Sequence, residues 1–509
     1  MGLFNSREKD TVLLNMSWEQ MAVEPGTPLT RDGLRDILCK NADVACREIY
    51  INADAKIPAF LIYIEGIVNE TFLNQYILAP LVQGEKFASV RSSRQAIETI
   101  RHGGVYFSKQ QIRTNINMAL YDVLNGSILL LFDGEQTAVS FEAKGFEKRQ
   151  ITPPTDENVF KGAKDSFVET LRVNTASVRQ KVRSVSLNIR EVIVGKQTLT
   201  PISVVYIEGI AREDIIKQVT DRLDKIDVDQ ALTTHIIEEY LNDNKYTLFP
   251  QIRKTERPST FCAGILEGYV GLLIDGLPLG FILPTSFALY LHAPDDYSQP
   301  FLVASVMRIM RHALLVLTLL LPGYYIAITS FHPEMLPTPL AFSIISSQEG
   351  TPLPVSAEVL LMVIAFEVLV EAGMRLPKMI GSFLSIVGAL VVGEAAIAAK
   401  FVSPGVVLVI AITAISSYTI PNQDLSIAVR LWRFLITLLC SLMGIFGLVI
   451  GALIMILNLS HLESLGVPYM APYVDNDYRR LGDALVRLPV WMQKKKPSLL
   501  KTADKVREQ

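Results

Sequence analysis

Acidic side chains lie within the most apolar part of the sequence, where a charge is costly. The stretch Val355–Gly373 contains Glu358, Glu367 and Glu371, and Glu394 is the only charge in the apolar run that follows it. A carboxylate near the centre of a bilayer costs about 2.5 kcal/mol or more, so it should face protein or water. An acidic lining is typical of a cation pathway, and these four glutamates are our candidates for one.

The spacing of these carboxylates leaves a second interpretation open. Glu367 and Glu371 are four residues apart, hence on one helical face, and Glu371 could pair with Arg375 four residues later. The stretch could therefore be an amphipathic helix on a membrane surface, or it could carry structural salt bridges at its ends. We favour the pathway lining for Glu367 and Glu394, and less so for Glu358.

The first half also contains carboxylates that could do acid–base chemistry. Glu65, Glu208, Asp133 and Asp275 each follow an apolar run, and turn chemistry at strand ends is the interpretation that we favour. The sequence shows no nucleophile beside a base, no glycine-rich phosphate loop and no HxxxH spacing among its six histidines. We therefore predict no enzyme, no cofactor and no metal site.

Composition indicates more than one domain and a membrane part. The chain has 509 residues, half of them hydrophobic, and a net charge of −3 that gives no indication of nucleic-acid binding. The four cysteines lack a metal-binding spacing. Cys39 and Cys46 are expected on one helix as buried thiols.

Two pairs of similar segments indicate an internal duplication. Tyr63–Gln75 resembles Tyr206–Gln218, and Leu124–Gly134 resembles Leu266–Gly276, in the same order and at nearly the same separation. A repeat of this kind predicts two copies of one structural unit.

In each copy an apolar run typical of a strand ends at a glycine, Gly66 or Gly209, and a helical pattern follows. The later Asp-Gly pairs predict hairpins. We expect two α/β lobes, and we expect each following helix to bury one face: Phe72, Leu73, Tyr76 and Ile77 in the first copy, and Ile215, Ile216, Val219 and Leu223 in the second.

The second half has the composition of membrane-spanning helices. Uncharged or nearly uncharged runs of about 20 residues can cross a bilayer, and Arg308 and Arg311 before the first run place that side inside. The predicted spans are Ala313–Phe331, Val355–Gly373, Met379–Ala399, Phe401–Ile420 and Phe434–Ser460.

Five spans would put the C-terminal tail outside, although Arg479, Arg480 and the lysines after them favour the inside. One segment could be re-entrant, Pro339–Ser347 could cross as well, or the tail could depart from the rule. The predicted domains are residues 1–150 (first lobe), 151–295 (linker helix and second lobe), 296–465 (four to six spans) and 466–509 (basic tail).

Small residues at helical spacing indicate close helix packing within the chain, between copies or with another protein. The candidates for helix packing or oligomer contacts are Gly381, Ser385, Ala389, Gly393, Gly447 and Gly451.

Several motifs, in the same order, are similar to those of one family, the GerA family of bacterial spore germinant receptor A subunits, which has a closely related stage V sporulation paralogue. The motifs include "GAKDSFVETLRVNT", "VVYIEGIA", "FPQIRKTERP", "LEGYVGLLIDGLP", "SFHPEMLPT", "FEVLVEAGMRLP", "SIVGALVVGEAA" and "GVPY".

The resemblance implies a multi-pass protein of the spore inner membrane whose N-terminal half faces the core cytoplasm. It implies a transporter-like B subunit and a lipoprotein C subunit as partners, besides membrane lipids. It also implies a homo-oligomer that forms a nutrient-gated cation-release channel. The alternative is a non-conducting scaffold that assembles the two partner subunits. A secondary transporter is less favoured, because the membrane half shows no inverted repeat.

Overall fold

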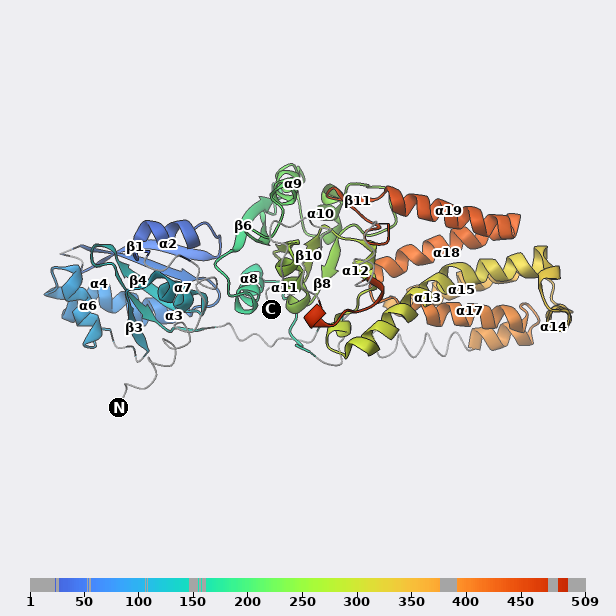
Figure 1. The fold of residues 1–509 in the computed structure, drawn as a ribbon, viewed down its shortest axis with the longest axis horizontal. Helices are drawn as coiled ribbons and strands as arrows, with labels where there is room; N and C mark the ends of the chain where they lie inside the picture. Colours follow the sequence, from blue (N-terminus) through green and yellow to red (C-terminus); the bar gives the residue numbers. More distant parts are fainter. Residues whose placement is uncertain are drawn as a thin grey trace. The chain divides into compact units, whose positions relative to one another are not determined.

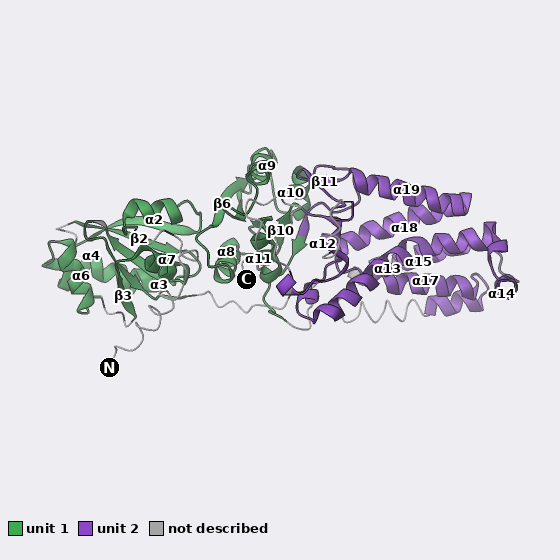
Figure 2. Cartoon of the chain, viewed as in Figure 1, with its two compact units in different colours: residues 1–241, 254–284, 495–507 green, residues 242–253, 285–494, 508–509 purple. Residues whose placement is uncertain are grey.

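The computed structural model divides the chain into two compact units (Figures 1 and 2). It describes residues 27–145 except 53, 55, 106 and 108, then 162–375, 391–474 and 484–492, together with 23, 154 and 157. The first unit, here the α/β unit, comprises Met1–Leu241, Lys254–Pro284 and Lys495–Arg507. The second, here the helical unit, comprises Asn242–Arg253, Thr285–Lys494 and Glu508–Gln509.

The α/β unit contains two five-stranded antiparallel sheets with the same strand order, β1-β2-β4-β5-β3 and β6-β7-β9-β10-β8. The first sheet consists of β1 (Val44–Ile51), β2 (Ile57–Ile64), β3 (Gln110–Arg113), β4 (Ile128–Phe132) and β5 (Thr137–Phe141). The second consists of β6 (Leu187–Val194), β7 (Thr200–Ile207), β8 (Arg253–Thr255), β9 (Val270–Ile274) and β10 (Gly280–Leu283).

The repeated segments occupy equivalent positions in these sheets. The two segments of the first pair begin in β2 and β7, the second strands in the order of their sheets. The two segments of the second pair lead into the neighbouring strands, β4 and β9. Gly66 and Gly209 follow β2 and β7 with φ of +76° and +80°, values that favour glycine. The same local requirement therefore produces the same chain exit in both lobes.

Helices cover these sheets, and one differs from the sequence expectation. Ile215, Ile216, Val219 and Leu223 of α9 are buried as expected. Phe72 and Tyr76, however, are 42% and 49% exposed, because Leu73–Leu78 forms a π-helix (η2) whose wider turn places only Leu73 and Ile77 in the core. The helices are α2 (Arg31–Leu38), α3 (Glu70–Phe72), α4 (Ala79–Gln83), α5 (Glu85–Ala88), α6 (Ser93–Arg101), α7 (Ile116–Leu124), α8 (Leu171–Lys181), α9 (Glu213–Asp224), α10 (Thr234–Leu241) and α11 (Pro258–Glu267).

The expectation for Cys39 and Cys46 was wrong. The two cysteines form a disulfide, because α2 ends before Cys39 and the chain turns into β1, which carries Cys46. Cys262 and Cys440 are buried thiols. Burial raises the pKa of Cys262 to about 12, so it has little thiolate at neutral pH.

The loop inside this disulfide joins the two lobes. Asp43 accepts two hydrogen bonds from the guanidinium of Arg179 on α8, at 2.8 and 3.0 Å, and both side chains are 1% exposed. The Ala42 amide donates to the carbonyl of Ile189 at 2.9 Å. The first lobe thus attaches to the linker helix and to the edge strand β6 of the second lobe.

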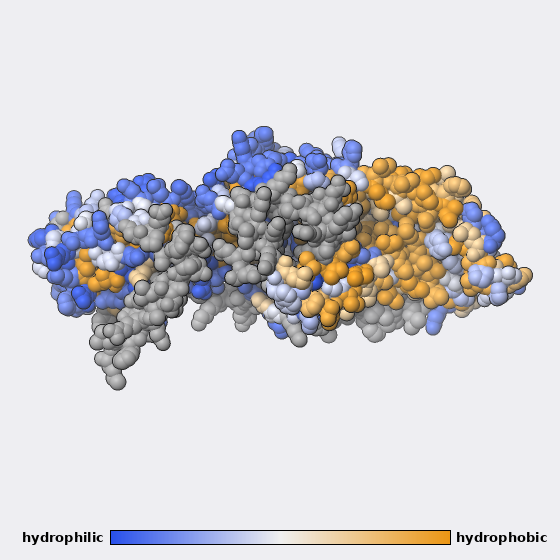
Figure 3. Space-filling model, viewed as in Figure 1, coloured by the Kyte–Doolittle hydropathy of each residue, from blue (hydrophilic) through white to orange (hydrophobic). Residues whose placement is uncertain are grey.

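The helical unit is built from long antiparallel helices that carry apolar side chains on their outer faces (Figures 1 and 3). Its helices are α12 (Phe287–Leu291), α13 (Phe301–Ile326) with its π-helical end η5 (Ala327–Phe331), α14 (Thr338–Gln348), α15 (Val355–Arg375), α17 (Pro404–Ser417), α18 (Gln423–Met443) and α19 (Ile445–His461). Residues 391–398 are also helical, and β11 (Glu463–Ser464) and β12 (Val467–Pro468) form a short hairpin.

Two of the described helices are long and apolar enough to cross a membrane, Phe301–Phe331 and Gln423–Met443. Pro404–Ser417 and Ile445–His461 are shorter apolar helices. The predicted single span Phe434–Ser460 was wrong, because the chain reverses at Gly444 (φ +58°) and the run contributes to two helices, α18 and α19.

Candidate functional site in the helical unit

Glu367 lies between two arginines of another helix. Its carboxylate, on α15, pairs with Arg430 of α18 at 3.1 Å and also with Arg433 of α18. Glu367 is 31% exposed and Arg433 only 1%. Two guanidinium donors offset much of the cost of placing a carboxylate in apolar surroundings, so this contact ties α15 to α18.

Glu358 is fully buried in the first turn of α15. Its Oε2 atom accepts hydrogen bonds from the amide and the hydroxyl of Ser403, at 2.9 and 2.8 Å. Ser403 is the N-cap residue of α17. The carboxylate thus lies at the positive end of a helix dipole, where a negative charge is favoured.

The other two candidate glutamates are on the surface of the unit. Glu371 pairs with Arg375 at 2.9 Å, as the four-residue spacing predicts, and both are exposed. Glu394 is exposed on the helix at residues 391–398, next to exposed Val391 and Val392. The structure therefore does not bring the four candidate carboxylates together into one cluster within a single chain.

The candidate glycines of the last helix lie against its neighbour. A Cβ atom on Gly447 would be 2.2 Å from the Leu439 carbonyl oxygen, and one on Gly451 would be 3.0 Å from Ile436 Cγ1. Both contacts are with α18 of the same chain. Gly393 lies against Val407, 3.3 Å from where its Cβ would be. Gly381, Ser385 and Ala389 lie outside the described residues.

A second charged cluster lies where the chain begins its first long helix. Asp296 is 2% exposed and accepts from Arg308 at 3.1 Å and from Arg311 at 2.7 and 2.8 Å. These arginines, predicted to precede the first span, are thus part of α13 and hold its N-terminal half to the preceding turn.

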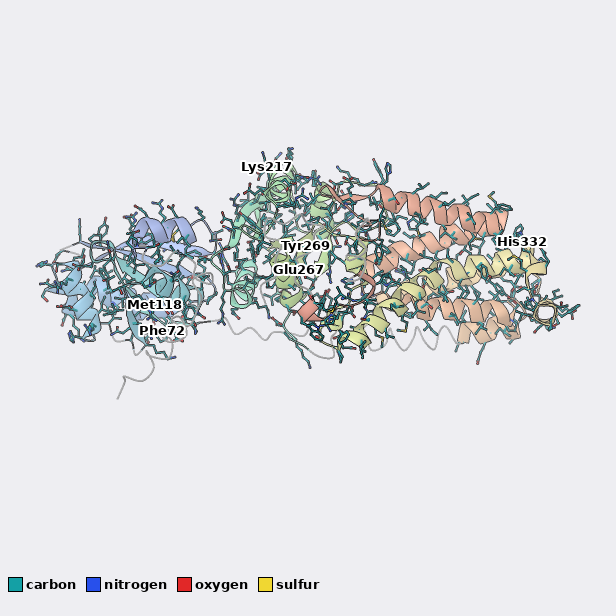
Figure 4. The ribbon with its side chains drawn as sticks, in the orientation of Figure 1. Phe72, Met118, Lys217, Glu267, Tyr269 and His332 are labelled. Carbon is teal, nitrogen blue, oxygen red and sulfur yellow. A yellow bond between two sulfur atoms is a disulfide. The ribbon has the colours of Figure 1, made fainter. Side chains whose placement is uncertain are left out.

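Two titratable groups lie near the base of α13. Burial, with Arg308 and Arg253 nearby, lowers the pKa of His292 well below its ordinary value. Burial raises the pKa of Tyr473, whose hydroxyl lies 2.7 Å from Nε2 of His312. The surroundings of the N-terminal half of α13 therefore keep His292 and Tyr473 neutral. At its C-terminal end α13 continues into η5, and His332 follows η5 (Figure 4).

The carboxylates of the α/β unit have structural contacts. Glu65 pairs with Arg172 at 3.2 Å, and burial raises its pKa although Arg172 opposes the shift. Glu208 accepts from Asn188 at 2.8 Å. Asp275 accepts from the Leu171 amide at 3.0 Å, at the start of α8. The contacts of these three residues fit the favoured interpretation, in which they stabilise turns and helix ends.

Sequence reasoning missed Asp296, Ser403, Arg430 and Arg433 as partners of charged groups. Arg430 and Arg433 are three residues apart on one face of α18, a signal that could have indicated a buried acidic partner. The identity of that partner depends on tertiary packing, because Glu367 is 63 residues away from Arg430.

A family model and several known proteins that are similar to this chain all indicate one family. Residues 32–499 match the model of the family described as Bacillus/Clostridium GerA spore germination protein. The chain is 36% identical to spore germination protein KA of Bacillus subtilis, over 92% of this chain and 85% of that protein. It is 33% identical to spore germination protein B1 of the same organism, over 94% and 98% of the two chains.

More distant relatives include stage V sporulation protein AF of Bacillus subtilis, at 30% identity over 76% of this chain and 78% of that protein. A crystal structure of the N-terminal domain of the A subunit of the Bacillus megaterium spore germinant receptor GerK3 aligns with a TM-score of 0.40 and 28% identity, covering 50% of this chain and 93% of that one. The family match spans nearly the whole sequence, and the chain therefore belongs to the Bacillus/Clostridium GerA family of spore germination proteins.

Proposed function

We propose that this chain is the A subunit of a nutrient-sensing germinant receptor in the spore inner membrane, and that copies of it assemble into a cation-release channel. Family membership supports the role in germination. The apolar outer faces of the long helices support a membrane location (Figure 3).

The proposed topology uses six crossings: α13, α15, the predicted span Met379–Ala399, α17, α18 and α19. An even number of crossings returns the chain to its starting side. The reversal at Gly444 supplies the sixth crossing, so the arginines before residue 312 and the basic tail share the inner side, as positive charges prefer.

The channel proposal depends on one observation, the exposure of the Glu394 carboxylate on an apolar helix. The part of the chain that the structure describes gives this carboxylate no ion-pair partner. Lipid is a poor environment for such a charge. A water-filled path between neighbouring copies would satisfy it. Glu371 is the second surface carboxylate, and in this proposal Glu367 and Glu358 stabilise the helices that flank the path.

The proposed partners are a transporter-like B subunit and a lipoprotein C subunit of the same receptor. The second candidate function is a non-conducting scaffold that only assembles these two subunits. The contacts of Glu367 and of Gly447 indicate a well-packed helical unit, which both functions require. These contacts therefore do not distinguish the two functions, which differ in the role of Glu394.

Potassium release from spores distinguishes the two functions. Spores that carry the Glu394→Gln variant should release potassium in rich nutrient medium at a changed rate, with the chain present in the inner membrane at the wild-type level. Glu349→Gln, which alters an exposed carboxylate after α14, is the matched control and should behave as wild type. A Glu394→Gln chain that changes release only in proportion to its abundance, or not at all, would favour the scaffold.

A further inference from the structure

Three buried polar atoms near the N-terminus of α17 lack a hydrogen bond of ordinary geometry among the described residues. They are Oε1 of Glu358, the hydroxyl of Tyr325 and Nε2 of Gln348. They come from α15, α13 and the last residue of α14. Buried polar groups are nearly always satisfied in folded proteins, so the unpaired Oε1 of Glu358, with two further poorly bonded atoms in the same place, indicates a missing partner.

These groups converge on the segment that begins α17. Glu358 binds Ser403 through its other oxygen, Oε2. The Tyr325 hydroxyl is affected by the charge of Glu358, and it lies close enough to the side chains of Ser403 and Gln348 for hydrogen bonding. The same hydroxyl occupies the space beside Gly405, since a Cβ on that glycine would be 2.6 Å from it. We call Glu358, Ser403, Tyr325 and Gln348 the Glu358 cluster.

The surroundings of the cluster are apolar. Val355 and Val359 flank Glu358 on its own helix, and Val402 and Val406 flank Ser403 on the other, all within one buried hydrophobic group. No lysine, arginine or histidine of the described residues forms an ion pair with Glu358. An isolated ionised carboxylate in such surroundings is costly unless it is paired or bound to a metal ion.

We propose that the Glu358 cluster binds one monovalent metal cation, Na⁺ or K⁺. The ligands are Oε1 of Glu358, the Tyr325 hydroxyl oxygen and the side-chain amide oxygen of Gln348, which rotation about the terminal bond presents in place of Nε2. Oxygen ligands suit hard cations. The cluster supplies a single negative charge, so a monovalent ion neutralises it, whereas a divalent ion would leave a net positive charge buried.

The bound cation would hold together α13, α14, α15 and α17, which each contribute a ligand or a ligand's hydrogen-bond partner. Because the cation binds the folded chain, the folded state should become more stable as the cation concentration rises. The inference does not depend on conduction: a chain that carries no current would still show this stabilisation.

Thermal unfolding of the purified full-length chain in detergent tests the site. NaCl, KCl and N-methyl-D-glucamine chloride are compared at equal ionic strength, and unfolding is followed by tryptophan fluorescence, to which buried Trp432 of α18 contributes. We expect the wild-type midpoint temperature to rise, with saturation, in NaCl or KCl relative to the organic cation. Glu358→Gln should abolish the rise, and Tyr325→Phe should shift its half-saturating concentration upward about tenfold.

Two conservative variants serve as matched controls. Tyr324→Phe removes the hydroxyl of the neighbouring, 45% exposed tyrosine, and Glu349→Gln removes an exposed charge one residue after Gln348. Both should keep the wild-type response.

Wild-type midpoints that are equal in all three salts would overturn the proposal and would indicate that a proton or a water molecule satisfies the cluster. A cation response that survives in Glu358→Gln would overturn it as well. If Glu358→Gln does not fold, an unchanged response in Tyr325→Phe is sufficient to reject the site.

Discussion

Two carboxylates of the helical unit, Asp296 and Glu367, have arginine partners on other segments, and this pairing lets them lie in apolar surroundings. Asp296 has Arg308 and Arg311, and Glu367 has Arg430 and Arg433. Removing one member of such a buried pair leaves an uncompensated charge, which costs about 3–5 kcal/mol. The pairs therefore specify one arrangement of the helices.

His292 gives a prediction for pH dependence. Its pKa in the folded chain is lowered well below the ordinary value of 6.5, by burial and by Arg308 and Arg253. Below about pH 6.5 the unfolded chain binds a proton that the folded chain does not, so this group lowers the stability by up to about 1.4 kcal/mol per pH unit. Above that pH its effect is constant.

Unfolding of the full-length chain between pH 5 and 8 checks this prediction. His292→Gln should reduce the loss of stability below pH 6.5, whereas His235→Gln, whose side chain is 73% exposed, should leave the profile unchanged. A His292→Gln chain with the wild-type slope would show that other groups cause the acid sensitivity.

At the scale of elements, the sequence predicted those features that depend on local patterns. The strands ending at Gly66 and Gly209 and the buried face of α9 follow from periodicity and from glycine's tolerance of positive φ. The Glu371–Arg375 pair follows from helical spacing. Within the α/β unit the π-helix at Leu73–Leu78 was not predictable, because its hydrogen-bond pattern has no clear sequence signature.

The reversal between α18 and α19 was missed for a related reason. The run from Phe434 to Ser460 contains neither a charge nor a proline, so hydropathy alone predicts one long span. Gly444 permits the turn, and Gly447 permits the close approach of the two helices after it. Glycine is common within membrane helices, and its presence could not by itself indicate a turn.

Alanine substitutions in α19 test this packing. Gly447→Ala places a Cβ against the Leu439 backbone, which cannot yield easily, and should destabilise the helical unit by about 1–3 kcal/mol. Gly451→Ala meets the Ile436 side chain instead, which can shift, and should cost less. Denaturation in mixed detergent micelles measures both. Equal effects of the two variants would contradict the close contact between α18 and α19 at Gly447.

For the whole molecule, the six proposed crossings predict a topology. A tag attached after Gln509 should lie on the same side of the membrane as the N-terminal half of the chain. A tag inserted after Gly350, in the loop between α14 and α15, should lie on the other side. Protease access in vesicles of known orientation measures this arrangement. A C-terminal tag on the same side as the loop tag would instead require an odd number of crossings.

Conductance of the purified chain in planar bilayers tests whether copies of this chain form a cation pathway past Glu394. We expect a cation-selective current from the wild-type oligomer, a current of altered conductance or selectivity from Glu394→Gln, and a wild-type current from Glu349→Gln. A wild-type chain that is folded and oligomeric in the bilayer but carries no current would contradict the proposed pathway.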